Sequence, residues 1–310
     1  MNLRNLKYIV TVADTRHFGK AAERCFVSQP TLSGQIKKLE EELGVAIFER
    51  SNRSVEITPV GRNIVIYARQ IMEQADAIVQ YASAHQDPLA GALQIGAMPT
   101  LSPYLMPLIL VPLKKRYPQM KMVLSEELTD TLLNRLHNYE IDAALLATPV
   151  DDPELVSMPL FDEPFWVAYP SKHRFYTRDK ITRRDLDKEN ILLLSEGHCL
   201  ASQAMEVLHI KERQSQGEMA DLRATSLETL IQLVKADFGV TLVPALAMRG
   251  SWTSGSGVVA QPLKAPGASR RISLVYRRSF PRVAALQAFA DTILERLPNT
   301  VKPVRRKKIT

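Results

Sequence analysis

The chain has only two cysteines among its 310 residues, and they lie far apart, at positions 25 and 199. Two cysteines cannot build a disulfide framework, which favours a reducing compartment and predicts a cytoplasmic protein. No apolar run approaches the ~20 residues of a membrane-spanning helix. The N-terminus is punctuated by charges, so we expect neither a membrane association nor a signal peptide.

Other chemical signatures are also missing from the sequence. It contains no HExxH motif, no Gly-rich phosphate loop and no clustered cysteines and histidines with metal-ligand spacing. We therefore expect no metal and no cofactor. Internal repeats at solenoid periods are absent as well, which excludes a repeat architecture.

Positive charge gathers at the two ends of the chain. Residues 1–62 carry ten Lys/Arg against seven Asp/Glu, and residues 301–310 carry five Lys/Arg and no acid. The net charge is +7, so the long middle is nearly neutral. A basic end region is typical of nucleic-acid binding, although a solvated surface with a frayed tail has the same composition.

The first 44 residues show helical spacing of apolar residues in three segments. Ser28 is expected to cap the third helix, Pro30 fits its first turn, and Gly44 ends it. Short hydrogen-bonding side chains cluster near the start of this helix, as in a helix that enters the major groove, whereas ordinary solvent faces carry more Glu and Lys. We predict DNA contacts by Ser28, Gln29, Pro30, Thr31, Ser33 and Gln35, and a phosphate contact by Lys37.

Two short strands, 46–49 and 55–58, are predicted to form a wing whose tip brings Arg50 and Arg53 to the DNA. Thr58-Pro59 then marks the start of a long helix that runs to about residue 85. Its apolar stripe includes Ile64, Tyr67, Ile71 and Ile78. A long helix with one apolar stripe needs a partner, so we predict a homodimer along this helix, with packing onto its own domain as the alternative.

From Ala92 onward, apolar strand-like runs alternate with helical segments, including a strand expected at 189–197 and a helix after Cys199. This pattern predicts an α/β region of two lobes joined by crossing strands, with a ligand cleft at strand ends. We expect four parts: a winged helix-turn-helix at 1–58, a linker helix and hinge at 59–90, a two-lobed effector region at 91–300, and a disordered basic tail at 301–310.

Cys199 lies in the segment SEGHCLASQAMEVLHI, where a predicted strand leads into the first turn of a helix. Backbone N–H groups and the helix dipole at such a turn stabilise an anion, which favours a thiolate. The residues alone nevertheless favour a buried, structural cysteine, because free cysteines usually pack as small apolar groups.

The segment FGKAAERCFVSQPTLSGQIKKLEEELGVAIFERSNRSVEITPVG resembles the winged helix-turn-helix of LysR-type transcriptional regulators almost throughout. The resemblance implies an α/β effector region like periplasmic binding proteins, double-stranded DNA as a partner, and a homodimer or homotetramer that works with RNA polymerase. It also implies a regulator and not an enzyme.

The segments PLFDEP, EGHCLASQAM, RATSLETL and GVTLVPALA are similar to the peroxide-sensing members of that family. This likeness implies that hydrogen peroxide oxidises Cys199 and that Thr100, Thr129 and His198 hold the peroxide. Such members carry a second cysteine shortly downstream, where this chain has Leu208. The likeness therefore implies a sensor that lacks its disulfide partner.

Two other interpretations remain open at this stage. The effector cleft can instead bind a small molecule or be insensitive to redox state, with Cys199 vestigial. A thiol peroxidase or a solute-binding protein is the third possibility. The predicted helix-turn-helix argues against both the thiol peroxidase and the solute-binding protein. A peroxidase would also need a recycling thiol close to Cys199.

Overall fold

The computed structural model describes residues 1–50, 55–84, 89–210, 224–249 and 257–304. The chain divides into two compact units, Met1–Pro88 and Leu89–Thr310. Residues 85–88 of the predicted hinge lie outside the described residues. No helix within the described ranges is long and apolar enough to cross a bilayer.

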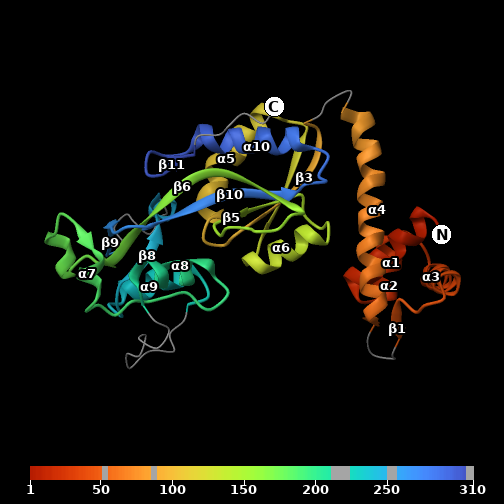
Figure 1. Ribbon diagram of the computed structural model, residues 1–310, viewed down its shortest axis with the longest axis horizontal. Coiled ribbons are helices and arrows are strands. Elements are labelled where there is room, and N and C mark those ends of the chain that lie inside the picture. Colours follow the sequence, from red (N-terminus) through yellow and green to blue (C-terminus); the bar gives the residue numbers. More distant parts are fainter. Residues whose placement is uncertain (51–54, 85–88, 211–223, 250–256, 305–310) are drawn as a thin grey trace. The chain divides into compact units, whose positions relative to one another are not determined.

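The N-terminal unit is a three-helix core with a two-stranded wing (Figure 1). Its helices are α1 (Leu3–Thr15), α2 (Phe18–Arg24) and α3 (Gln29–Leu43), and its antiparallel strands are β1 (Phe48–Arg50) and β2 (Val55–Ile57). Each helix turns one apolar face inward. The fully buried residues of this core are Ile9, Val12, Ala21, Leu32, Ile36, Leu39 and Ile47.

The predicted ends of α3 are confirmed. The Ser28 hydroxyl accepts a hydrogen bond from the Thr31 N–H at 3.3 Å, which satisfies a donor that the first helical turn leaves open. Gly44 closes the helix at φ +69°, a left-handed conformation that costs glycine little.

The wing strands begin and end differently from the prediction. Ala46 and Ile47 were expected in the first strand, but β1 starts only at Phe48. The N–H of Ile47 bonds to the Glu40 carboxylate and its carbonyl accepts from the Thr58 N–H. These two residues are therefore tied to α3 and to the start of the next helix.

Helix α4 (Pro59–Ala84) follows the wing and spans 26 residues, or roughly 39 Å. Thr58 caps it as predicted, because its Oγ1 accepts from the Gly61 N–H at 2.8 Å. Val65 and Ala68 are buried against the core of the N-terminal unit, and Arg69 forms an ion pair with Asp14 of α1. The first half of α4 thus belongs to the N-terminal unit.

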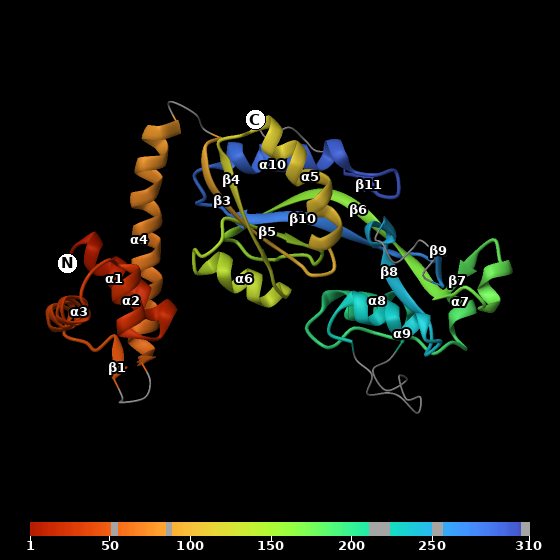
Figure 2. The same ribbon diagram turned by 180° about the vertical axis from the view of Figure 1, so that it is seen from behind.

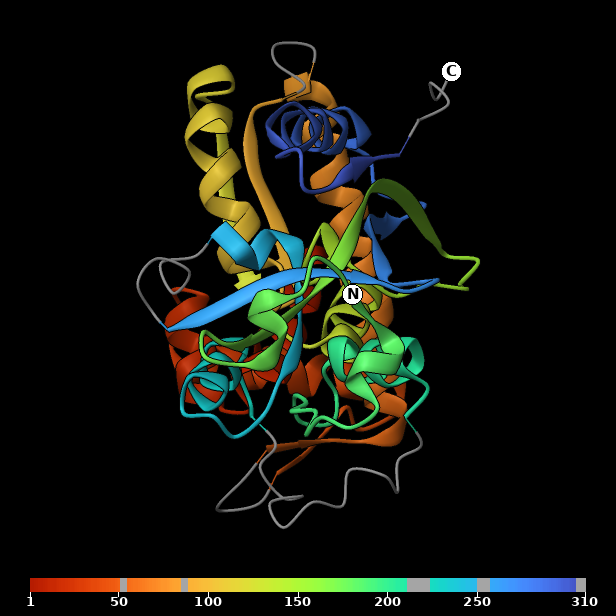
Figure 3. The ribbon, with the colours of Figure 1, turned by 90° about the vertical axis from the view of Figure 1, so that its left-hand side faces the viewer.

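In the first lobe of the second unit, helices cover both faces of a mixed sheet. Helices α5 (Ser102–Arg116) and α10 (Val283–Arg296) pack together on one face, and α6 (Thr129–His137) lies on the other (Figure 2, Figure 3). The strands, in sheet order, are β4 (Met120–Glu126), β3 (Gly91–Ala97), β5 (Ala143–Leu146), β10 (Ser269–Arg277) and β6 (Leu155–Pro170). The β4–β3 and β3–β5 pairs are parallel, as the alternating pattern predicted.

The second lobe is built on the far half of β6, which is 16 residues long and crosses from one lobe to the other. There β6 pairs with β8 (Thr241–Pro244) and β9 (Val258–Lys264), and β9 pairs with β7 (Ile181–Thr182). The helices are α7 (Arg183–Leu186), α8 (Cys199–Leu208) and α9 (Leu227–Lys235), with short 3-10 turns at Arg174–Thr177 and Ala245–Arg249. Two separate cores, one in each lobe, confirm the two-lobed prediction.

Two expectations for this unit are wrong. The strand predicted at 189–197 is reduced to isolated bridges, Ile191 with Val240 and Leu194 with Ala224. Residues 301–304 of the tail predicted to be disordered are also ordered, whereas residues 305–310 lie outside the described residues. Val301 is 4% exposed, and Lys302–Pro303 form β11, which pairs with β6. Buried apolar contact and strand pairing outweigh the charge of this segment.

A buried ion pair fastens the crossing strands to the first lobe. Glu163 of β6 and Arg270 of β10 face each other in register, with side chains 0% exposed and 2.9 Å apart. Glu163 also accepts from the Leu246 N–H, and Arg270 donates to the Thr100 hydroxyl and carbonyl oxygens. Every charge of the pair therefore has hydrogen-bond partners, which a buried ion pair requires.

Arg270→Leu should lower the free energy of unfolding by about 3–5 kcal/mol, because it leaves the Glu163 carboxylate buried without its cation. The neighbouring pair Arg271–Asp162 is a matched control, since it occupies the next register position at 2.8 Å but is exposed. Arg271→Leu should cost less than about 1 kcal/mol. Urea unfolding measures both, and equal losses would contradict the assignment.

Candidate functional site

The start of α3 presents the side chains that were predicted to read DNA. Ser28, Gln29, Pro30 and Thr31 are exposed, whereas Ser33 and Gln35 are half-buried. The hydroxyls of Ser28 and Thr31 lie 2.8 Å apart. Short polar groups at an exposed helix N-terminus have the geometry to meet base edges in a major groove.

Of the three predicted phosphate contacts, only the Lys37 side chain lies within the described part of the structure. Lys37 is exposed on α3, and its ammonium lies 3.8 Å from Glu41, one turn along the helix. Arg50 is the last residue of β1, and Arg53 lies outside the described residues. Cations on the recognition helix and at the wing suit the sugar-phosphate backbone, which carries no base information.

The predicted dimer stripe on α4 is only partly exposed. Tyr67, Ile71 and Ile78 have exposed fractions of 64%, 41% and 73%. Ile64, the fourth predicted residue, is half-buried against the core of its own unit. These three side chains, with Val60 and Val79 of the same helix, form an apolar surface that its own unit leaves open.

Cys199 lies where the two lobes meet. It is the first residue of α8, whose apolar face, Leu200 and Ala204 included, belongs to the second-lobe core. The Cys199 side chain instead packs against the first-lobe core, with its Sγ 3.4 Å from the Sδ of Met98. A group added to this thiol would therefore press on the contact between the lobes.

Gln203 makes a second contact across the same junction. Its Nε2 donates to the Ala147 carbonyl, at the end of β5, over 2.8 Å. No motif in the sequence marks Gln203, yet it follows Cys199 at the i,i+4 spacing that puts side chains on one helix face. Residues 199 and 203 thus carry the face of α8 that touches the first lobe.

His198 is the N-cap residue of α8 and is 9% exposed. Burial lowers the pKa of its imidazole below the usual value, and a hydrogen bond to the backbone of Thr225 opposes that effect. The ring is thus held uncharged at neutral pH. A neutral imidazole can both donate and accept a hydrogen bond.

Thr100 lies at the other side of this junction, after β3, and is 2% exposed. Arg270 donates to its Oγ1 at 2.9 Å and to its carbonyl at 3.0 Å. Because a guanidinium can only donate, the Thr100 hydroxyl accepts here and keeps its own proton for another acceptor. Sequence reasoning missed Arg270, since no local pattern pairs a strand arginine with a residue 170 positions away.

Thr129 is half-buried at the first position of α6, and its hydroxyl has no hydrogen bond to any described residue. The preceding residue, Leu128, approaches Gly197 so closely that a Cβ there would lie 3.1 Å from its Cδ1. The Leu128–Gly197 approach and the Cys199–Met98 contact together bring three segments close to one another, at 98–100, 128–129 and 197–199. These segments carry all four residues of the predicted peroxide site.

Leu208 is buried in the second-lobe core at the far end of α8, with 6% exposure. Leu208 is nine positions further along the helix than Cys199, so their Cα atoms lie roughly 13 Å apart. A disulfide joins Cα atoms about 4.4–6.8 Å apart. Even a cysteine at this position would reach Cys199 only after α8 had unwound.

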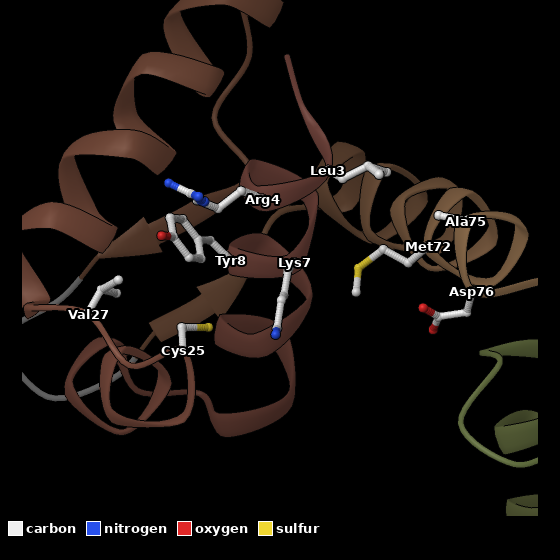
Figure 4. A pocket seen from close by; sticks show the side chains of 9 residues that line it. All are labelled: Leu3, Arg4, Lys7, Tyr8, Cys25, Val27, Met72, Ala75 and Asp76. Carbon is white, nitrogen blue, oxygen red and sulfur yellow. The ribbon is translucent and has the colours of Figure 1, made fainter. Parts of the chain in front are cut away.

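The second cysteine, Cys25, is half-buried at the end of α2, and its thiol donates to the Thr11 hydroxyl at 3.4 Å. It packs against the core of the N-terminal unit. A cavity of about 530 Å³ adjoins it, between α1 and α4 (Figure 4). Arg4, Lys7 and Met72 are among the side chains that line this cavity.

Comparison with known families identifies both units. Residues 3–62 match the bacterial regulatory helix-turn-helix model of the LysR family, and residues 86–298 match the LysR substrate binding domain. The chain therefore belongs to the LysR family of transcription regulators, which are not enzymes.

Within this family the chain is a homologue of OxyR proteins. It is 40% identical over 297 residues to a hydrogen peroxide-inducible genes activator of Pectobacterium carotovorum subsp. carotovorum, covering 96% of this chain and 97% of that one. It is 38% identical over full length to the DNA-binding transcriptional dual regulator OxyR of Escherichia coli K12. A full-length Pseudomonas aeruginosa OxyR with a cysteine-to-aspartate substitution superposes with a TM-score of 0.84, at 38% identity and 99% coverage of both chains.

Proposed function

We propose that this chain is a cytoplasmic, peroxide-responsive DNA-binding activator that senses oxidation through Cys199 and makes no disulfide within its effector unit. The observation that carries the proposal is the position of Cys199, a thiol at a helix N-terminus that packs across the junction of two lobes. The names of its OxyR relatives support peroxide as the effector.

The chemical step needs only the thiol and the peroxide. The thiolate sulfur attacks one peroxide oxygen, an S–O bond forms and the O–O bond breaks. The leaving hydroxide takes a proton and becomes water. The sulfur loses two electrons to the peroxide, and the product is a sulfenic acid.

The residues around Cys199 have suitable hydrogen bonds for this step. Thr100 keeps a hydroxyl proton that it can donate to a peroxide oxygen, because Arg270 occupies its acceptor side. The Thr129 hydroxyl has no hydrogen bond to a described residue, and His198, whose imidazole pKa is lowered by burial, directly precedes Cys199 in the chain. Donors aimed at the leaving oxygen stabilise the negative charge that develops there.

The fate of the sulfenic acid distinguishes this chain from a two-cysteine sensor. The only other cysteine in the sequence, Cys25, belongs to the N-terminal unit, and Leu208 fills the core at the end of α8. The sulfenic acid therefore persists or condenses with a small thiol, which gives a mixed disulfide and releases water. Either product enlarges the side chain between the lobes.

DNA and other copies of the chain are the partners in this proposal. The exposed start of α3 reads bases in the major groove and the wing contacts the backbone. The apolar face of α4 pairs with a second copy, which gives a homodimer or homotetramer on two half-sites and allows contact with RNA polymerase.

Limited peroxide treatment should add one oxygen, or one glutathione when that thiol is present, at Cys199 in intact-mass and peptide analysis. The operator footprint should change in parallel, and the change should be absent in Cys199→Ser. A loss of two hydrogens mapped to Cys25–Cys199 would contradict the one-cysteine scheme. A footprint indifferent to peroxide would instead favour a small-molecule effector or a vestigial Cys199.

A companion variant, Leu208→Cys, tests the missing partner directly. It should gain a reversible disulfide with Cys199 on oxidation, together with loss of helical circular dichroism, because α8 must unwind to bring the two sulfurs together. Cys199 oxidation that leaves the new thiol free would mean that α8 stays helical.

Gln29→Ala should relax sequence preference, whereas Lys37→Ala should weaken binding to all sequences and reduce the salt slope of log K by about 1. Lys121→Ala, which removes the same charge from β4 of the effector unit, is the control and should leave binding unchanged. Fluorescence anisotropy on matched and scrambled operators at several salt concentrations separates these outcomes. Two variants with unaltered affinity and preference would exclude α3 as the reading helix.

Ile71→Asp should shift the protein toward monomer, because each buried isoleucine contributes roughly 1.5–3 kcal/mol to association. Operator binding should fall with it. Gln70→Asp adds the same charge about 100° round the helix and should leave the dimer intact. Sedimentation analysis compares the two, and equal dissociation constants would contradict pairing along this stripe.

A further inference from the structure

The base of the wing, Ala46–Phe48, is held by side chains from the helices on either side of it. On the α3 side, the Glu40 Oε1 accepts from the N–H groups of Ile47 and Phe48 at 2.8 and 3.1 Å. On the α4 side, the Thr58 hydroxyl donates to the Ala46 carbonyl at 2.8 Å. We call the three residues Ala46, Ile47 and Phe48 the wing base.

The first turn of α4 lies directly against the wing base. The Thr58 N–H donates to the Ile47 carbonyl at 3.0 Å, and the Thr58 Oγ1 accepts from the Gly61 N–H. A Cβ at Gly61 would overlap the Ile47 carbonyl oxygen, so only glycine permits this approach. The end of α3, the wing base and the start of α4 are thus joined by polar contacts.

Two of the three residues of the wing base, Ile47 and Phe48, are also buried, which makes their backbone groups depend on these partners. Ile47 is 0% and Phe48 4% exposed, and the Phe48 ring packs edge-on against Phe18 of α2 at 6.0 Å between centroids. Water has little access to the two N–H groups that Glu40 accepts. Removing that carboxylate would leave two donors unsatisfied, and the backbone would shift to find other acceptors.

We propose that Glu40 is a positioning residue for DNA binding, which with Thr58 clamps α3, the wing and the first turn of α4 into one rigid piece. The clamp sets the angle between the helix that enters the major groove and the wing that contacts the backbone. It also carries any rotation of α4 directly to both DNA-contacting elements. This inference rests on the proposed DNA-binding function and adds a residue that touches no DNA.

Operator binding by the full-length protein tests the clamp with three variants. Glu40→Ala should weaken binding roughly tenfold at moderate salt and lower the salt slope by about 1, as the wing loses a phosphate contact. Preference among base sequences should be retained, because α3 keeps its side chains. Hydroxyl-radical footprinting should show lost protection only at the edge of each half-site.

Glu40→Gln keeps an amide oxygen that can accept the same two N–H groups, and it should restore at least half of the lost protection. Glu42→Ala removes the same charge two residues further along α3, from an exposed carboxylate that pairs with the N-terminal ammonium. It should bind as the unsubstituted protein does. This comparison separates the geometry of the clamp from the charge of α3.

The clamp proposal would be overturned if Glu40→Ala kept the footprint and the salt slope of the unsubstituted protein, provided that the unsubstituted protein itself gives a clear footprint. Equal weakening in Glu42→Ala would do the same, because it would assign the effect to charge. Absence of any footprint by the unsubstituted protein would overturn the proposed function itself. If Glu40→Ala does not fold, Glu40→Asp replaces it, since its shorter carboxylate cannot reach both N–H groups and should give the same edge-specific loss.

Discussion

The buried ion pair between Glu163 and Arg270 is the interaction on which the effector unit depends. Its two charges lie in adjacent strands at the point where β6 passes from the first lobe to the second. The remaining donors of Arg270 hold Thr100 in place, and Glu163 also binds the Leu246 backbone. One polar network therefore supports both the connection between the lobes and one wall of the proposed sensing site. This network holds β6 and β10 together at the crossing, because separating the pair would leave a buried charge without a partner.

This arrangement explains how chemistry at one atom can affect a large structure. Cys199 and Gln203 lie on a helix whose core is in the second lobe, yet both touch the first lobe. Densely packed junctions respond to added volume by shifting between discrete packings. In the proposed function, a sulfenic acid or a mixed disulfide at Cys199 would change which packing is favoured. Without a covalent bond to hold the new packing, the proposed response would follow the lifetime of the modification.

The local elements were predictable because their determinants are close in sequence. Ser28, Gly44 and Thr58 marked helix ends, and the alternating pattern indicated the parallel strands of the first lobe. Contacts between distant segments were not predictable. No local sequence pattern predicts the contact of Arg270 with Thr100 or that of Gln203 with Ala147. The apolar run at 189–197 has the pattern of a strand, but in the structure it forms only isolated bridges with neighbouring segments. The residues of the proposed sensing site came from family resemblance, and the structure supplied their neighbours, such as Arg270 at Thr100 and Met98 at Cys199.

The pairing of β11 with β6 affects how the end of the chain can be handled. Lys302 and Pro303 lie opposite Asp162 and Phe161, and the Val304 N–H donates to the Leu160 carbonyl at 2.9 Å. Asp162 and Phe161 immediately precede Glu163, the buried acid of the lobe junction. A purification tag or fusion partner joined at residue 300 would uncover this edge of β6 beside the charge pair. A junction placed after residue 304 keeps the edge covered.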